Sequence, residues 1–149
     1  MAEPKTPLLA ADCVVFDANG RVLLVRRKYP PFQGHYALPG GFVEIGETVE
    51  DACRRELLEE TGINVGALRL VGVYSDPKRD PRGHICSVVF VASAPHGGPQ
   101  AEPKAGDDAA AAEWVADWSH VALAFDHAKV LADAFRLAHK LETDDRAGE

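Results

Sequence analysis

Three glutamates near the end of one amphipathic segment are the residues best suited to chemistry. In segment 48–61 an apolar stripe at helical spacing continues into Glu56 and Glu60. Glu59 lies beside them on the adjoining side of the same face. Carboxylates crowded on a sheltered face are ligands that Mg²⁺ and Mn²⁺ prefer. We therefore expect a divalent metal site on this helix, with an ordinary solvated acidic face as the alternative.

Several predicted elements must position this helix. Thr48 is suited to cap its start and Gly62 to end it. Strands are predicted at 11–17, 21–27, 36–38, 68–74, 85–94 and 111–115, with a loop at 95–105 and a frayed tail from 142. A second helix at 125–141 is expected to bury Ala128, Leu131, Phe135 and Ala138. This order predicts an α/β protein with a mixed sheet covered by helices.

Composition sets limits on the function. The 149 residues fit one domain, spanning 1–149, and no apolar run is long enough to cross a membrane. The N-terminus also lacks the pattern of a secretory signal. The net charge of −7 disfavours nonspecific binding to nucleic acid or to an anionic membrane surface. The negative net charge still permits binding of a small anionic ligand if a metal ion or a local arginine cluster supplies positive charge.

The three cysteines, Cys13, Cys53 and Cys86, are widely spaced and form no CxxC pair. Their odd number and apolar neighbours favour packing roles over a zinc or redox site. Free thiols of this kind fit a reducing cytoplasm.

A longer motif surrounds the acidic helix. Residues 41–63 read GFVEIGETVEDACRRELLEETGI. They resemble the signature of the Nudix hydrolases: Gly, five residues, Glu, seven residues, then Arg-Glu-apolar-x-Glu-Glu-x-Gly-apolar. The resemblance implies a Nudix-type α/β/α sandwich with a mixed β-sheet. It also implies Mg²⁺-dependent hydrolysis, by water attack at phosphorus, of a nucleoside diphosphate linked to another group. Mn²⁺ is expected to substitute for Mg²⁺.

The resemblance assigns roles residue by residue. It implies four metal ligands, which are the main-chain carbonyl of Gly40 and the carboxylates of Glu56, Glu59 and Glu60. It implies that Glu47 and Arg55 organise the acidic cluster. A guanidinium suits this role because it binds a carboxylate through two hydrogen bonds. The alternative for Arg55 is a weak surface ion pair with Asp51.

The general base is left open among several acids. A metal-bridging water has a lowered pKa, so a carboxylate need only orient it and accept its proton. Glu56 and Glu59 are candidates within the helix. Loop 100–110 offers Glu102, Asp107 and Asp108, of which we favour Asp108.

A second resemblance, over most of the chain, is to the ADP-ribose pyrophosphatase branch of this family. Loop 75–84 carries it best and gathers the cationic side chains Lys78, Arg79, Arg82 and His84. Such a patch suits phosphate or ribose hydroxyls, although a plain solvated loop is the alternative. The residues expected to bind substrate are Arg27, Arg79, Arg82 and Tyr74. His127, in a stretch that resembles the family's FDH sequence, is interpreted as a helix-capping or core histidine.

The leading prediction is therefore hydrolysis of ADP-ribose to AMP and ribose 5-phosphate. The main alternative is the same chemistry on a nucleoside triphosphate such as 8-oxo-dGTP. A minor alternative is an ADP-ribose sensor without activity, which the complete set of glutamates disfavours. The expected partner is a small nucleotide rather than nucleic acid or membrane. A homodimer is suggested only by analogy, because related ADP-ribose pyrophosphatases are often dimers.

Overall fold

Strand β1 (Leu8–Phe16) lies at the centre of a mixed seven-stranded sheet in the computed structural model of the protein, which describes residues 3–93 and 102–147. The main path of the sheet runs through β3 (Tyr36–Ala37), β2 (Val22–Arg27), β1, β6 (Ile85–Ser93) and β5 (Arg69–Tyr74). Two further strands pair off this path, β4 (Gly40–Phe42) with β1 and β7 (Ala109–Val115) with β2. The β1–β6 pair is parallel and the other pairs are antiparallel, so the predicted mixed sheet is confirmed.

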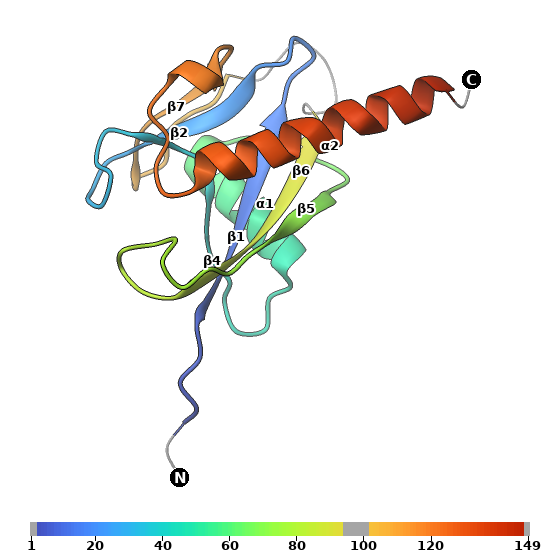
Figure 1. Ribbon diagram of the computed structural model, residues 1–149. Helices are drawn as coiled ribbons and strands as arrows, with labels where there is room; N and C mark the ends of the chain where they lie inside the picture. The colour runs from blue at the N-terminus through green and yellow to red at the C-terminus, as the bar shows by residue number, and fades with distance from the viewer. Residues whose placement is uncertain (1–2, 94–101, 148–149) are drawn as a thin grey trace.

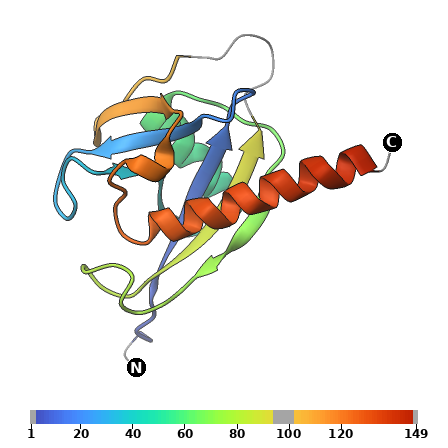
Figure 2. The same ribbon diagram turned by 45° about the horizontal axis from the view of Figure 1, so that its top comes forward.

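Two helices cover opposite faces of this sheet (Figures 1 and 2). Helix α1 (Val49–Thr61) contributes Ala52, Cys53 and Leu57 to one buried cluster. Helix α2 (His127–Ala147) contributes Val130, Leu131 and Ala134 to the other. Alternate residues of β1 enter the two clusters because successive side chains of a strand point to opposite faces. This is the three-layer α/β/α arrangement that was predicted.

Helix α1 starts and ends where the sequence indicates. The side chain of Thr48 accepts a hydrogen bond from the Asp51 backbone N–H at 3.1 Å, which satisfies a free donor of the first turn. Gly62 adopts a left-handed φ of 74° and donates its N–H to the Leu58 carbonyl. Local capping chemistry therefore fixes both ends of the helix that carries the acidic residues.

Several details differ from the sequence prediction. Strand β4 and the short 3₁₀ helix Trp118–His120 were not predicted. Helix α2 continues to Ala147 instead of fraying from 142, and the loop predicted at 95–105 lies mainly outside the described residues. The predicted stripe of α2 is wrong in part, because Ala128 and Phe135 are exposed. Phe135 packs edge-on against Phe16, the last residue of β1, while residues 130, 131 and 134 are buried in the cluster between α2 and the sheet. Neither described helix is long and apolar enough to span a membrane.

Candidate active site

Strand β4 brings two glycines into close contact with β1 and α1. A Cβ on Gly40 would lie 2.0 Å from an Asp12 carboxylate oxygen and 2.5 Å from the Ala11 carbonyl. A Cβ on Gly41 would lie 2.5 Å from the carboxylate carbon of Glu56. Only residues without a side chain fit here, so the glycines let the backbone reach the acidic side chains. The Gly40 carbonyl, a predicted metal ligand, belongs to this strand.

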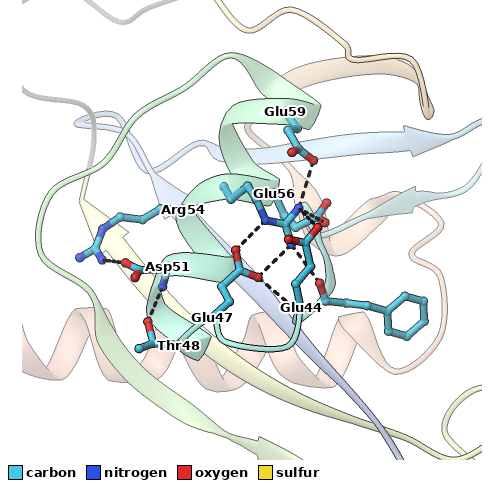
Figure 3. A network of polar contacts seen from close by, with 9 residues as sticks. Glu44, Glu47, Thr48, Asp51, Arg54, Glu56 and Glu59 are labelled. Atoms are coloured by element: carbon cyan, nitrogen blue, oxygen red, sulfur yellow. Dashed lines mark hydrogen bonds and ion pairs between the residues drawn. The ribbon is translucent and has the colours of Figure 1, made fainter.

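The carboxylates of Glu47, Glu56 and Glu59 belong to one network of polar contacts (Figure 3), and Arg55 donates hydrogen bonds to all three. Its guanidinium binds Glu47 through Nε at 2.7 Å and Nη2 at 3.1 Å. Its Nη1 donates to Glu56 at 2.8 Å and to Glu59 at 3.3 Å, and Nη2 also donates to the Phe42 carbonyl at 3.0 Å. The hydrogen bonds from Arg55 hold the pKa of Glu47 below its usual value. Arg55 thus pairs with Glu47, whereas Asp51 pairs with Arg54 and not with Arg55.

The side chain of Glu60 contacts β4. Its carboxylate accepts a hydrogen bond from the Gly40 backbone N–H at 3.1 Å. Burial raises the pKa of Glu60 to about 8, and nearby negative charges add to this effect. Burial likewise raises the pKa of Glu56. Within residues 3–93 and 102–147, no three acidic, histidine or cysteine side chains converge as a ready-made metal site.

A cavity of about 400 Å³ opens beside these acids. Four of its lining acids lie near one another and are called the acidic side here: Asp12, Glu56, Glu60 and Asp108. A second group, called the cationic side here, consists of Arg27 and Arg82 around Phe125, with the lining acid Asp80 paired to Arg82. Glu59 is not among the lining residues, and its side chain is 58% exposed. The cavity thus joins carboxylates suited to a cation with guanidinium groups suited to phosphate.

Loop 102–108 is fastened to the end of α1, which explains how Asp108 reaches the cavity. The backbone N–H of Lys104 donates to the Thr61 carbonyl at 2.8 Å, and that of Gly106 donates to the Glu60 carbonyl at 3.0 Å. Asp108 then lines the acidic side of the cavity. Glu102 and Asp107 are not lining residues, and the Asp107 carbonyl accepts a hydrogen bond from Lys28. Of the three loop acids considered from sequence, only Asp108 borders the cavity.

Two arginines stack against one phenylalanine on the cationic side. The guanidinium carbon of Arg27 lies 4.9 Å from the Phe125 ring centroid, and that of Arg82 lies 5.3 Å from it. Phe125 has a left-handed φ of 53°, a conformation that costs energy for a bulky residue. Burial, and then the positive charge of Arg82, lowers the pKa of Arg27. Two of the four predicted substrate-binding residues therefore share this wall.

Arg79 also lines the cavity, but its guanidinium is engaged within the protein. It forms a two-pronged ion pair with Asp126, at 2.9 and 2.7 Å, and donates to the Ser87 hydroxyl at 2.8 Å. Its side chain is 5% exposed. Tyr74 is not a lining residue at all, since its hydroxyl donates to Asp133 of α2 at 2.7 Å and its ring packs in the α2 core. The structure thus separates Tyr74 from the other predicted substrate-binding residues.

Asp12 is a cavity residue that was missed from the sequence. It lies on β1 opposite Gly40 and is 7% exposed. Burial raises its pKa to about 7, although Arg79 and a hydrogen bond with Ser87 act in the opposite direction. The signal in the sequence was an acid inside the otherwise apolar run of β1. A charge in such a run needs a partner, which Arg79 and Ser87 supply from distant segments.

The sequence and the fold of this chain are similar to those of known proteins. A family model described as NUDIX domain matches residues 6–135. An ADP-ribose pyrophosphatase of Methanocaldococcus jannaschii is 48% identical over 130 residues, which cover 87% of this chain and 74% of that protein.

Two further relatives have different names. The ADPR responsive transcriptional repressor NtrR of Acinetobacter baylyi is 33% identical over 143 residues, which cover 91% of this chain and 56% of the repressor. The NUDIX domain of Shewanella oneidensis NrtR, solved as a cocrystal with ADP ribose, superposes with a TM-score of 0.79 at 29% identity and covers 90% of both chains. The match to the family model over most of its length shows that this chain belongs to the NUDIX domain family.

Proposed function

We propose that the protein hydrolyses ADP-ribose to AMP and ribose 5-phosphate. The observation that carries this proposal is the cavity that brings Glu56 and Glu60 together with Arg27 and Arg82. A diphosphate bridge suits such a cavity, because the acidic side supports a cation and the cationic side pairs directly with phosphate oxygens. The 48% identity to an ADP-ribose pyrophosphatase supports the choice of substrate.

A divalent metal ion fits the acidic side. The available donors are hard oxygen atoms, and the half-buried Glu56 and Glu60 hold carboxylates whose charged forms call for a cation. We propose that Glu56, Glu59, Glu60 and the Gly40 carbonyl bind Mg²⁺, for which Mn²⁺ can substitute. When bound, Mg²⁺ would offset phosphate charge and lower the pKa of the attacking water.

Arg55, next to the acidic side, orients these carboxylates, and an acid on that side accepts a proton. Arg55 fixes the carboxylates of Glu47, Glu56 and Glu59 through its hydrogen bonds, so their positions are set before substrate arrives. We propose Asp108 as the general base, since it borders the cavity from a loop fastened to α1. Glu56 is the alternative base on the same side of the cavity.

On the cationic side, we propose that Arg27 and Arg82 bind the substrate directly. Arg82 binds Asp80 through Nε and Nη2, and Arg27 donates its Nε–H to the Pro31 carbonyl, so the other N–H groups of each guanidinium would pair with phosphate or ribose oxygens. Arg79 is assigned an indirect role, because Asp126 and Ser87 already occupy its donors. It positions the loop that carries Arg82. No contact supports a substrate role for Tyr74.

The partner proposed for the cavity is a small nucleotide. One relative is named as a transcriptional repressor, but this chain covers only 56% of the length of that protein, so the repressor function is not proposed for this chain. We also propose a cytoplasmic location, which fits the free thiols of Cys13, Cys53 and Cys86. A homodimer stays a proposal by analogy, which light scattering at several protein concentrations would test.

A substrate panel tests the proposed function. Purified protein would be incubated with Mg²⁺ and either ADP-ribose or 8-oxo-dGTP, and the products would be identified by mass spectrometry. We expect a higher kcat/KM for ADP-ribose, with AMP and ribose 5-phosphate as products. A preference for 8-oxo-dGTP would favour the triphosphate alternative. Tight ADP-ribose binding without turnover would favour the sensor.

A further inference from the structure

His127, the first residue of α2, has a fixed arrangement of its ring nitrogens. Its Nδ1 accepts a hydrogen bond from the Leu38 backbone N–H at 3.1 Å. A nitrogen that accepts a hydrogen bond carries no proton, so the proton of the neutral ring lies on Nε2. The ring therefore presents one N–H donor on the side opposite Leu38.

This donor opens on the cavity. His127 is one of the lining residues and is 6% exposed. Within the part of the chain that the structure describes, Nε2 has no hydrogen-bond partner. In that part, the side-chain nitrogen or oxygen atom that is both fully enclosed and without a partner is Nδ1 of His35. Nε2 of His127 also has no partner, so it is not fully enclosed, and the cavity that His127 lines gives a ligand access to it. A nearly buried donor directed into a binding cavity calls for an acceptor from a ligand.

The ring also stays neutral at physiological pH. Burial lowers the pKa of His127 to about 4. The positive charges of Arg79 and Arg27 act in the same direction, while the negative charges of Asp126 and Asp80 oppose it. At neutral pH the ring therefore offers an uncharged donor, with its tautomer set by the protein.

We propose that His127 is a substrate-binding residue whose Nε2–H donates a hydrogen bond to a phosphate oxygen of the substrate. The imidazole ring lies 5.4 Å from the ring of Phe125, against which Arg27 and Arg82 stack. Two guanidinium groups at this wall attract an anionic group, and phosphate is the anionic part of a nucleotide. The inference rests on the proposed function, because it takes the substrate from there.

Two substitutions separate binding from structure. In His127→Asn the amide oxygen can replace Nδ1 as the acceptor for Leu38, but nothing replaces the Nε2 donor. In His127→Gln the longer side chain can place an N–H near the position of Nε2, but the acceptor for Leu38 is lost. We would measure kcat/KM for ADP-ribose at fixed Mg²⁺ and the urea midpoint of each variant.

We expect the two variants to rank in opposite orders in kcat/KM and in urea midpoint. His127→Asn should lose about 10- to 150-fold in kcat/KM, the range for a hydrogen bond to a charged group, while keeping the higher urea midpoint. His127→Gln should keep kcat/KM within a few-fold of wild type with the lower midpoint. Equal kcat/KM for His127→Asn and wild type, or activity losses that follow the stability losses, would overturn the inference alone. Wild-type protein without activity on ADP-ribose would overturn the proposed function and this inference together.

Discussion

The two arginines of loop 75–84 differ in environment, and we predict that they differ in role. Arg79 is 5% exposed and binds Asp126 and Ser87 with most of its donors. Arg82 has a side chain that is 45% exposed and pairs with Asp80 beside the ring of Phe125. Arg79→Lys should therefore reduce stability, whereas Arg82→Ala should reduce substrate binding.

The size of the stability effect follows from the contacts. A lysine at 79 keeps the charge but cannot bind both Asp126 oxygens and Ser87 together, so at least one hydrogen bond to a charged group is lost. Such a loss costs about 1.5–3 kcal/mol of the free energy of unfolding. A domain of this size has roughly 5–15 kcal/mol, so the variant still folds. With an m value of about 2 kcal/mol/M, the urea midpoint should fall by roughly 1 M.

The matched control is Arg82→Lys. It should cost less than about 1 kcal/mol, because the Arg82 side chain is half exposed and the Arg82 backbone N–H, which the substitution keeps, also donates to Asp80. Arg82→Ala should lower kcat/KM for ADP-ribose by about 10- to 150-fold. Unfolding followed by the fluorescence of the two tryptophans, together with steady-state kinetics, would measure both effects. An Arg79→Lys variant as stable as wild type, or equal stability losses at both positions, would refute the reasoning.

Three other predictions concern the acidic side and the thiols. Glu56→Gln and Glu59→Gln should each lower kcat by about 10²–10³-fold without changing the urea midpoint, and near wild-type turnover at saturating Mg²⁺ would contradict their role as ligands. The three cysteines, which are free in the structure, should all react with a thiol reagent after denaturation, and dithiothreitol should not change activity. In metal-free protein, Glu60 has a folded pKa of about 8, above its unfolded value, so the native state binds the extra proton and stability should fall as pH rises from about 4.5 to 8. Urea unfolding in EDTA at several pH values would show this slope, and Glu60→Gln should reduce it.

The parts of the site that follow local rules could be predicted from the sequence. The capping of α1 by Thr48, its end at Gly62 and the acidic face all depend on neighbours within one or two helical turns. The pairing of Glu47 with Arg55 also lies within one short segment.

Contacts between distant segments could not be predicted in the same way. The partner of Arg79 is Asp126, which directly precedes α2 and lies 47 residues further along the chain. Strand β4 forms only because Gly40 and Gly41 pair with β1, a partner that three residues cannot specify. Tyr74 has an aromatic ring suited to an adenine, but the docking of α2 decides that its hydroxyl meets Asp133.

The parallel pairing of β1 with β6 has a consequence for how the protein folds. The nine residues of β1 pair without a register shift with a strand roughly half the chain away, and this central pair supplies side chains to both buried clusters. Neither helix has a complete sheet surface to pack on until β1 and β6 have paired. The two helices should therefore pack on the sheet in one cooperative step. A ligand that binds beside α1 should therefore stabilise the whole native state. It should slow amide hydrogen exchange in the core of α2 by the same free energy as in the core of α1.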